Sequence, residues 1–307
     1  MKKKKRNKTL IIAIVLMLIA IGILIAMILS RGHGTGTAGV SESIGTSAIQ
    51  ARTTAGEALE EINTEISSHV YSHRGSAGPQ EHSFNAYDAA IEAGSRYIEQ
   101  DIVISSDGIL YVSHDENAYS MTGYDGMYEY MSSETIDGLK TEAGNKVLRL
   151  SEVFDRYGRD INYVIELKDG SDACVKAFEE LVDSYGNADI ITVQSEDLGV
   201  LEELESKYPD MPKLYVCRSQ GRFDNAVSRP YVDIISVKEE ATLMTERNCS
   251  AAHANDKVFS AWTLNTEDQI KYAIEMGVDT YFTDDTPLAL SLERDYGLIE
   301  GIRRGKE

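Results

Sequence analysis

The sequence predicts an α/β fold in which eight parallel strands form a closed barrel, with an extra β-hairpin at its mouth and one transmembrane helix before it. Three observations support this prediction. Short apolar runs alternate with helical patterns over ~240 residues, which suits a (β/α)8 barrel. Several of these runs are apolar at successive positions, as expected for parallel strands buried on both faces. Polar and charged residues gather where the runs end.

Nine segments have the composition of strands, and helical patterns lie between most of them. The expected strands are His69–His73, Tyr97–Ser105, Ile109–His114, Ile161–Lys168, Asp189–Gln194, Lys213–Arg218, Asp233–Lys238, Val258–Leu264 and Thr280–Thr283. The clearest helical patterns are Ser83–Ala93, Ser151–Tyr157, Asp172–Tyr185, Glu196–Tyr208 and Thr266–Met276.

The second and third strands are too close in the chain to be parallel neighbours. Only residues 106–108 separate them, whereas a parallel crossover needs about a dozen residues or more. The Asp-Gly pair between them favours a tight hairpin turn. We therefore expect an antiparallel hairpin whose returning arm brings His114 to the mouth, beside Glu99 and Asp101. Eight strands then remain for the barrel.

The N-terminal residues have the composition of a membrane anchor. Residues 1–8 carry six basic side chains, and residues 9–29 are an uncharged apolar run. At ~1.5 Å per residue this run spans the roughly 30 Å hydrocarbon core of a bilayer. A cleaved signal peptide is the alternative, but its apolar region is usually ~7–15 residues with small residues before the cleavage site. We expect an uncleaved anchor, a Gly/Ser-rich spacer with a short helix at 30–67, and the barrel domain at 68–307.

The charge around the apolar run predicts the location of the protein. The positive-inside rule places the basic tail in the cytoplasm and the barrel domain outside, in a single-pass protein of the cell membrane. Without its six basic residues the chain has 24 basic and 50 acidic residues, a net charge of −26. This charge excludes nucleic acid as an expected partner. No protein partner is identifiable.

Chemically active side chains stand where the expected strands end, which is the catalytic end of β/α barrels. A barrel with only a structural role would need none of them there. They are His73, Arg74, Glu99, Asp101, Glu166, Lys168, Gln194, Arg218, Lys238, Trp262, Asn265 and Asp284.

Three of these residues are carboxylates that suit a hard divalent cation. Glu99 and Asp101 are two apart on one strand and face the same side, and Glu166 arrives from the neighbouring strand. Such oxygen donors bind Mg²⁺ or Ca²⁺ rather than zinc, and Ca²⁺ is favoured outside the membrane. The alternative is a set of salt bridges with Arg74 and Lys168.

Two histidines, His73 and His114, reach the same mouth from different elements. Near neutral pH one histidine can accept a proton while the other donates one. Arg74 and Lys168 would bind phosphate oxygens and stabilise developing charge, although Lys168 could instead only neutralise the carboxylates. Together these groups suit metal-assisted chemistry on a phosphate ester.

Seven short motifs follow one another over ~215 residues, in the order and spacing of a known family. They are His73-Arg74-Gly75, Ile98–Asp101, Asp107-Gly108, His114-Asp115, Glu166–Lys168, Trp262–Asn265 and Thr283-Asp284. In these motifs the sequence resembles the glycerophosphodiester phosphodiesterase family, whose fold is a TIM barrel.

The resemblance implies hydrolysis of a glycerophosphodiester to glycerol 3-phosphate and an alcohol. It also implies metal binding by Glu99, Asp101 and Glu166, and acid–base roles for His73 and His114. Two other activities stay open: a related phosphodiesterase acting on lysophospholipids, phosphoinositides or wall polyol-phosphate polymers, and a module that binds phosphodiesters without turnover. Retention of both histidines and all three carboxylates argues against the binding module.

One segment departs from the family pattern P-E-N-T. Glu81 is kept, but His82 replaces the asparagine and Ser83 replaces the threonine. Ser83 can still cap the following helix, so the change bears on substrate preference more than on the chemistry. We expect Glu81, Trp262 and Asn265 to line the substrate pocket, with core packing as the alternative for Trp262.

Residues 115–148 form a long insert rich in tyrosine and methionine. The insert could be a lid that contacts the alcohol part of the substrate. Its aromatic residues could equally be the face that packs on the barrel. The residues concerned are Tyr119, Met121, Tyr124, Met127, Tyr128, Tyr130 and Met131.

Overall fold

The expected barrel is present in the computed structural model, which describes residues 70–78 and 80–298. Eight parallel strands form a ring in the order β1-β2-β4-β5-β6-β7-β8-β9, and β1 closes it by pairing with both β2 and β9. The ring strands are β1 Val70–Ser72, β2 Tyr97–Ile104, β4 Asn162–Leu167, β5 Ile191–Ser195, β6 Lys213–Cys217, β7 Ile234–Lys238, β8 Val258–Trp262 and β9 Thr280–Thr283. All eight lie within one or two residues of the expected segments.

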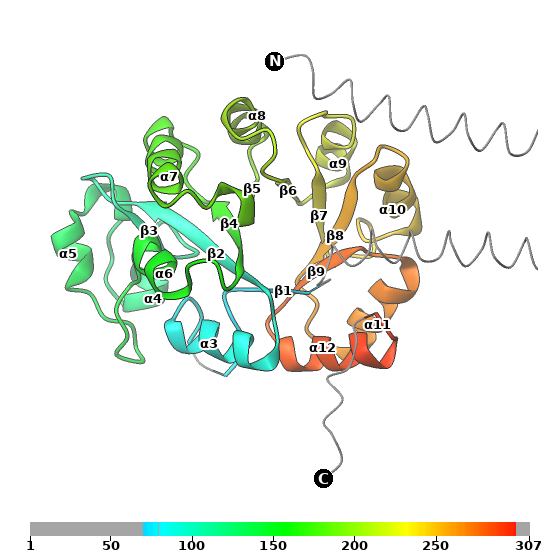
Figure 1. Cartoon of the computed structure of the whole chain (residues 1–307), viewed down its shortest axis with the longest axis horizontal. Coiled ribbons are helices and arrows are strands. Elements are labelled where there is room, and N and C mark those ends of the chain that lie inside the picture. Colours follow the sequence, from blue (N-terminus) through cyan, green and yellow to red (C-terminus); the bar gives the residue numbers. More distant parts are fainter. Residues whose placement is uncertain (1–69, 79, 299–307) are drawn as a thin grey trace, which may run out of the picture. The chain divides into compact units, whose positions relative to one another are not determined.

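Helices surround this ring on the outside (Figure 1). The long ones are α3 Phe84–Ala93, α6 Leu150–Tyr157, α7 Asp172–Tyr185, α8 Leu198–Lys207, α9 Gln220–Ala226, α10 Glu246–His253, α11 Glu267–Met276 and α12 Thr286–Asp295. Hydroxyl side chains begin several of them, because a serine or threonine oxygen can accept a bond from a free N–H of the first turn. Ser83 does so for α3, as expected, and Thr266 does so for α11.

Two apolar layers position the site. The outer layer lies between the strands and the helices and makes up the main core. The inner layer fills the barrel below its mouth and includes Tyr71, Val164, Leu214 and Phe282. Because side chains alternate along a strand, the residue two positions after Val164 points the same way one layer higher. That residue is Glu166, so the inner face changes from apolar to charged towards the carboxyl ends of the strands.

The hairpin is also confirmed. Strand β3 (Leu110–Val112) runs antiparallel to the end of β2, with Ile102 opposite Val112. Gly108 turns the chain with a φ of 85°, a conformation that a side chain disfavours. The returning arm then runs back along β2, where Ser113 N–H donates to Asp101 O at 3.0 Å. His114 follows directly and reaches the barrel mouth.

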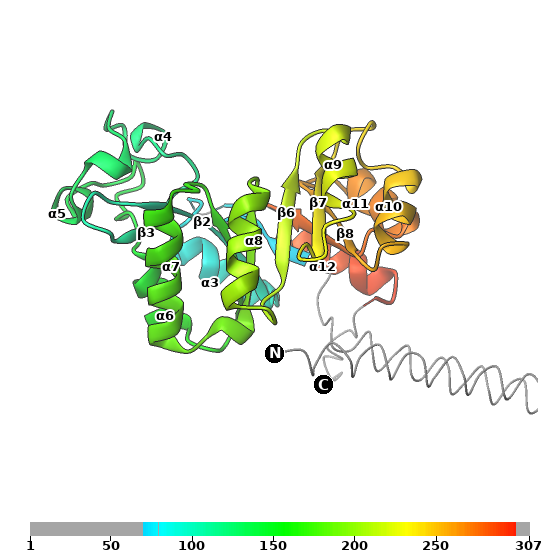
Figure 2. The same ribbon diagram turned by 90° about the horizontal axis from the view of Figure 1, so that it is seen from above.

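The insert packs against the outer side of this hairpin. It contains α4 (Tyr119–Thr122), a 3-10 turn at Tyr128–Tyr130 and α5 (Ser133–Asp137), which lie to one side of the barrel in Figure 2. Its buried face packs on Val103 and Tyr111 and includes Met121, Tyr128 and Met131. Tyr119, Tyr124 and Tyr130 are exposed. Met121, Met131 and Tyr128 therefore form a packing face on the hairpin, which was one of the two interpretations.

The expected membrane anchor at residues 9–29 and the spacer at 30–67 lie outside the described residues. Within residues 70–78 and 80–298, no helix has both the length and the apolar character needed to cross a bilayer. The anchor therefore stays a prediction from the sequence.

Candidate active site

A pocket opens at the barrel mouth and collects most of the residues singled out in the sequence. It is bounded by the carboxyl ends of the strands and by the arm that follows β3. Its lining residues are His73, Arg74, Glu99, Asp101, His114, Glu166, Lys168, Gln194, Val216, Arg218, Ser236, Trp262 and Phe282.

His73 is oriented by a carboxylate from the far end of the chain. Its Nδ1 lies 2.7 Å from Asp284 Oδ1. A proton on Nδ1 is therefore donated to this carboxylate, and Nε2 is available for proton transfer. Asn265 fixes the carboxylate in turn, donating from Nδ2 to Asp284 Oδ2 at 2.6 Å and accepting from the Asp284 N–H at 2.8 Å. The ring of His73 therefore has one preferred tautomer and one preferred orientation.

His114 has a similar arrangement, with the neighbouring residue as its partner. Its Nδ1 lies 2.7 Å from Asp115 Oδ1, and again Nε2 is the free ring nitrogen. Burial lowers the pKa of His114, and the charge of Asp101 opposes this effect. The pocket thus holds two imidazoles, each with a carboxylate on Nδ1.

Glu99 and Glu166 are buried carboxylates with few compensating partners. Glu99 accepts from the Arg74 N–H at 2.8 Å and from Gln194 Nε2 at 3.1 Å. Glu166 accepts from Lys168 Nζ at 3.0 Å. Burial, followed by the charge of Asp101, raises the pKa of Glu99 well above its ordinary value and that of Glu166 to about 7. Both groups would gain from a further positive charge.

Asp101 is the carboxylate with the most cationic surroundings. Its Oδ2 lies 3.3 Å from Arg74 Nε, and its Oδ1 lies 3.5 Å from Lys168 Nζ. Burial acts to raise the pKa of Asp101, but the hydrogen bond from His82 and the charges around it prevail and lower it. Asp101 is therefore ionised at neutral pH.

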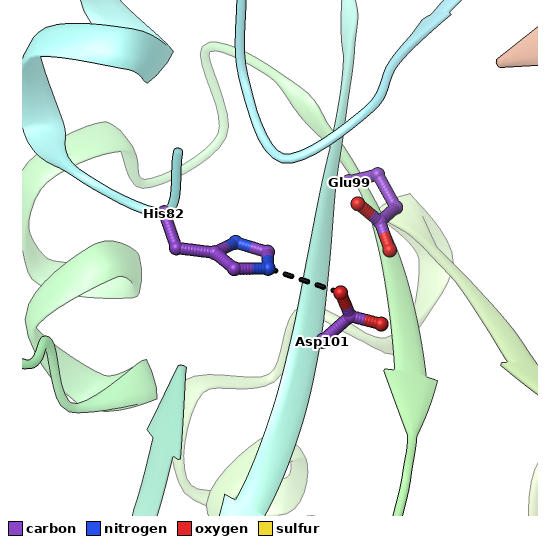
Figure 3. A group of neighbouring side chains, drawn as sticks. All are labelled: His82, Glu99 and Asp101. Carbon is purple, nitrogen blue, oxygen red and sulfur yellow. Dashed lines mark hydrogen bonds and ion pairs between the residues drawn. The ribbon is translucent and has the colours of Figure 1, made fainter. Parts of the chain in front are cut away.

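His82 is a buried neighbour of these carboxylates. Figure 3 shows its ring pointing at Asp101, with Nε2 at 3.0 Å from Asp101 Oδ2. The Nδ1 of His82 is 3.1 Å from the hydroxyl of Tyr87. His82, Glu99 and Asp101 each offer a ligand atom within 4.8 Å of the others, the only such group of three in the described part of the chain. Glu166, which we expected as the third ligand, is not in that compact group and lies beside it.

The donor set fits a divalent cation. Glu99, Asp101 and Glu166 would carry three negative charges when ionised, against one positive charge each on Arg74 and Lys168. The salt bridges considered as an alternative do exist, yet they leave Glu99 and Glu166 with raised pKa values. Buried carboxylates that cannot all ionise on their own are a suitable set for a hard cation, which prefers oxygen ligands.

The turn that carries Arg74 depends on the glycine after it. Arg74 has a φ of 56° and Gly75 a φ of 102°. A Cβ on Gly75 would lie 2.6 Å from the Cβ of Ala86 in α3, which no packed side chain allows. The histidine-arginine pair is thus held at the mouth because the backbone of the next residue, which has no side chain, can approach the helix closely.

Two residues expected in the pocket do not line it. Glu81 Oε2 accepts from Arg74 Nη1 at 3.1 Å, and Asn265 bonds to Asp284. Glu81 thus contacts a residue of the pocket lining, and Asn265 contacts the carboxylate that orients another one. Trp262 does line the pocket and also packs on the inner apolar layer, so both interpretations of that residue hold.

Four residues at the site have no role that the sequence predicts: Asp284, His82, Gln194 and Arg218. Asp284, Gln194 and Arg218 were recognised at strand ends, but the strand pattern does not say what their side chains contact. His82 was noticed only as a departure from a motif. The signal for its role was the replacement of an amide by a histidine next to a buried pair of carboxylates.

Comparison with known proteins agrees with this geometry. The sequence profile described as "Glycerophosphoryl diester phosphodiesterase family" matches residues 73–288, which include every residue of the pocket. The chain belongs to this family. Its members are hydrolases, and the chain is therefore an enzyme of that class.

The following relatives are distant, but each matches about three quarters of this chain. A glycerophosphodiester phosphodiesterase of Bacillus subtilis is 24% identical over 254 residues, covering 73% of this chain and 86% of the relative. Among solved structures, a protein of Silicibacter pomeroyi has a TM-score of 0.68 at 22% identity, covering 76% of this chain and 95% of that one. A phosphodiesterase of Oleispira antarctica, solved with the product sn-glycerol-3-phosphate, has a TM-score of 0.65 at 20% identity, covering 76% and 99%. These likenesses confirm the barrel fold.

Proposed function

We propose that this protein is a metal-dependent glycerophosphodiester phosphodiesterase that releases glycerol 3-phosphate and an alcohol. One observation carries the proposal: His73 and His114 line one pocket with each Nδ1 bonded to a carboxylate, and both Nε2 atoms are available for proton transfer. The Oleispira relative with bound glycerol 3-phosphate supports the choice of product.

The two histidines can divide the proton transfers of the hydrolysis. Cleavage breaks the bond between phosphorus and the leaving oxygen and forms a new bond between phosphorus and the attacking oxygen. One imidazole removes the proton of the attacking hydroxyl, and the other gives a proton to the departing alcohol. The attacking group is water or a substrate hydroxyl that first forms a cyclic phosphate.

Positive charge at the mouth binds the phosphate and stabilises the charge that develops on it. Arg74 and Lys168 are the basic groups closest to the carboxylates. Glu99, Asp101 and Glu166 would hold a Ca²⁺ or Mg²⁺ ion, with His82 beside them. When bound, such an ion supplies further positive charge next to the phosphate oxygens.

The alternative substrates remain within the same chemistry. Lysophospholipids, phosphoinositides and polyol-phosphate polymers of the cell wall all contain a phosphodiester that this set of residues could cleave. Their larger alcohols would extend beyond the mouth.

We also propose that the enzyme is anchored in the cell membrane with its barrel outside. The support is the basic tail at residues 1–8 followed by the uncharged run at 9–29. Protease treatment of intact cells tests this arrangement. Degradation of the barrel domain with retention of the tail is expected, and full protection of the domain would contradict it.

The activity is tested with full-length protein and glycerophosphoethanolamine, by following the phosphorus signals of substrate and product by NMR. We expect glycerol 3-phosphate to appear, a chelator to abolish its release, and Ca²⁺ or Mg²⁺ to restore it. His73→Ala and His114→Ala are each expected to lower kcat by about 10²-fold or more. His253→Ala is the control, because His253 pairs with Asp279 at the opposite end of the barrel.

Full activity in both histidine variants would overturn the acid–base roles. Tight binding of the diester without product over long incubation would show a binding module instead. A transient cyclic glycerophosphate signal would identify the substrate hydroxyl as the attacking group.

A further inference from the structure

Arg218 lines the same pocket but has no part in the chemistry proposed above. It directly follows β6, whereas His73 and Arg74 directly follow β1. In the ring of eight strands, β6 is four strands away from β1 in either direction. The pocket therefore has cationic side chains on two opposite walls, with the catalytic groups on only one of them.

The guanidinium of Arg218 is held in a fixed orientation. Its central carbon lies 4.7 Å from the centre of the Trp262 ring, a distance suited to stacking of the cation on the aromatic face. Trp262 is itself fixed, because its Nε1–H donates to Ser236 O at 3.2 Å. Glu196 accepts from the Nε of Arg218. Little side-chain freedom remains to be lost when a ligand binds.

Arg218 and its ion-pair partners carry a net positive charge. Glu196 is shared, since its second oxygen accepts from Arg222 Nη1 at 3.1 Å. Two arginines therefore face one carboxylate. Nε is the only donor of Arg218 that a described residue engages, which leaves the two terminal nitrogens able to bind an anion in the forked geometry that suits phosphate and carboxylate.

We propose that Arg218 binds a second anionic group of the substrate. This group belongs to the part of the substrate that extends across the mouth, away from the phosphate that is cleaved. The preferred substrates are then glycerophosphodiesters whose other part carries an additional phosphate or carboxylate. Diesters of neutral or cationic alcohols have no second anion for Arg218 to bind, and the positive charge of Arg218 also repels a cationic alcohol. This inference rests on the proposed function, because it places the scissile phosphate at the wall of Arg74 and Lys168.

The experiment compares substrates that differ only in the second anion. Glycerophosphoserine and glycerophosphoethanolamine differ by a carboxylate, and glycerophosphoglycerol phosphate and glycerophosphoglycerol differ by a phosphate. With the full-length enzyme and its metal, we expect kcat/KM to favour the anionic member of each pair by about tenfold or more, mainly through KM. A preference only in the phosphate pair would identify phosphorylated alcohols as the source, and one only in the serine pair would identify carboxylated alcohols.

The variant Arg218→Gln is expected to bring both ratios close to one, and Arg218→Lys to retain part of the preference. Arg222→Gln is the matched control, because Arg222 also pairs with Glu196 but does not line the pocket. It should leave the ratios as they are in the wild-type enzyme. Thermal melting of each variant shows whether the fold survives.

Two results would overturn the inference while leaving the proposed function intact: equal kcat/KM within both pairs in the wild type, or ratios that Arg218→Gln and Arg222→Gln change equally. If the wild type hydrolyses no member of either pair, the proposed function itself fails. The same pairs are then titrated by calorimetry, where equal affinities would also overturn the role of Arg218.

Discussion

His73 and Asp284 are 211 positions apart, yet the Nδ1 of the histidine lies 2.7 Å from an oxygen of the carboxylate. They meet because β1 and β9 are neighbours where the barrel closes, with Ser72 opposite Thr283. Each residue directly follows its strand. The closure of the ring thus joins the first and last strands, and it also brings a carboxylate within hydrogen-bonding distance of the first of the two histidines.

Replacing this carboxylate by an amide should impair catalysis more than binding. In Asp284→Asn the amide can donate to Nδ1, which favours the tautomer with the proton on Nε2, and the protonated ring loses the stabilisation that the carboxylate provides. We expect kcat to fall by about 10²- to 10⁴-fold with a small change in KM, measured by steady-state kinetics. Asp295→Asn, a substitution of an exposed residue on α12, should leave both constants unchanged. Equal loss in both variants would indicate a general effect on α12.

His82 should act on the cation through Asp101. It has a φ of 53° and bonds to Asp101 Oδ2. Asparagine tolerates this backbone region and keeps an N–H donor, whereas alanine does neither. We expect His82→Ala to weaken the affinity for the divalent ion by about 10- to 100-fold and His82→Asn to change it only slightly. Calorimetric titration with Ca²⁺ or Mg²⁺ measures both. Equal affinity in all three proteins would exclude this role.

The pH dependence of kcat/KM should show the lowered pKa of His114. If the neutral imidazole accepts the proton, activity falls once the histidine is protonated. Because burial lowers its pKa below the ordinary 6.5, the acid limb of the profile should lie below pH 6.5. Asp115→Asn removes a hydrogen bond that raises this pKa, so its acid limb should move to still lower pH. Movement towards neutrality would contradict the assignment.

A buried acid outside the site should make stability depend on pH. Glu293 in α12 is fully buried, and burial raises its pKa from 4.5 to about 7. Below pH 4.5 it is protonated in both the folded and the unfolded state. As pH rises from 4.5 to 7 the unfolded state releases its proton first, so the free energy of unfolding falls, by up to roughly 3 kcal/mol.

The variant Glu293→Gln should remove this dependence, because glutamine has no proton to lose. Urea unfolding at pH 4.5 and pH 8 measures it. We expect the variant to be more stable than the wild type at pH 8 by about 1–3 kcal/mol and to lose that advantage at pH 4.5. A wild type whose stability rises between these pH values relative to the variant would contradict the raised pKa.

Local pattern was sufficient for the strands and for the hairpin. Strands buried on both faces must be apolar, and residues 106–108 are too few for a parallel crossover. The number of barrel strands and the return of His114 both followed from this. The shared face of Glu99 and Asp101 followed equally from the two-residue period of a strand. These features depend on residues close together in the chain.

Contacts between individual side chains were not visible in the sequence pattern. The sequence predicted Glu81 and Asn265 in the pocket lining, whereas their side chains form hydrogen bonds with Arg74 and Asp284. It noted His82 as a substitution, but only the folded structure shows its ring at Asp101. Such contacts depend on side-chain direction and on which strands are neighbours in space.

The sequence by itself therefore determined the barrel, its hairpin and the end at which chemically active residues collect, because alternation and loop length are local properties. Only the tertiary structure decided which of these residues touch. It joined Asp284 to His73 through the closure of the ring, and it placed Arg218 on the opposite wall. The physical reason is that closing a barrel sets distances between strands that the chain separates by up to about two hundred residues.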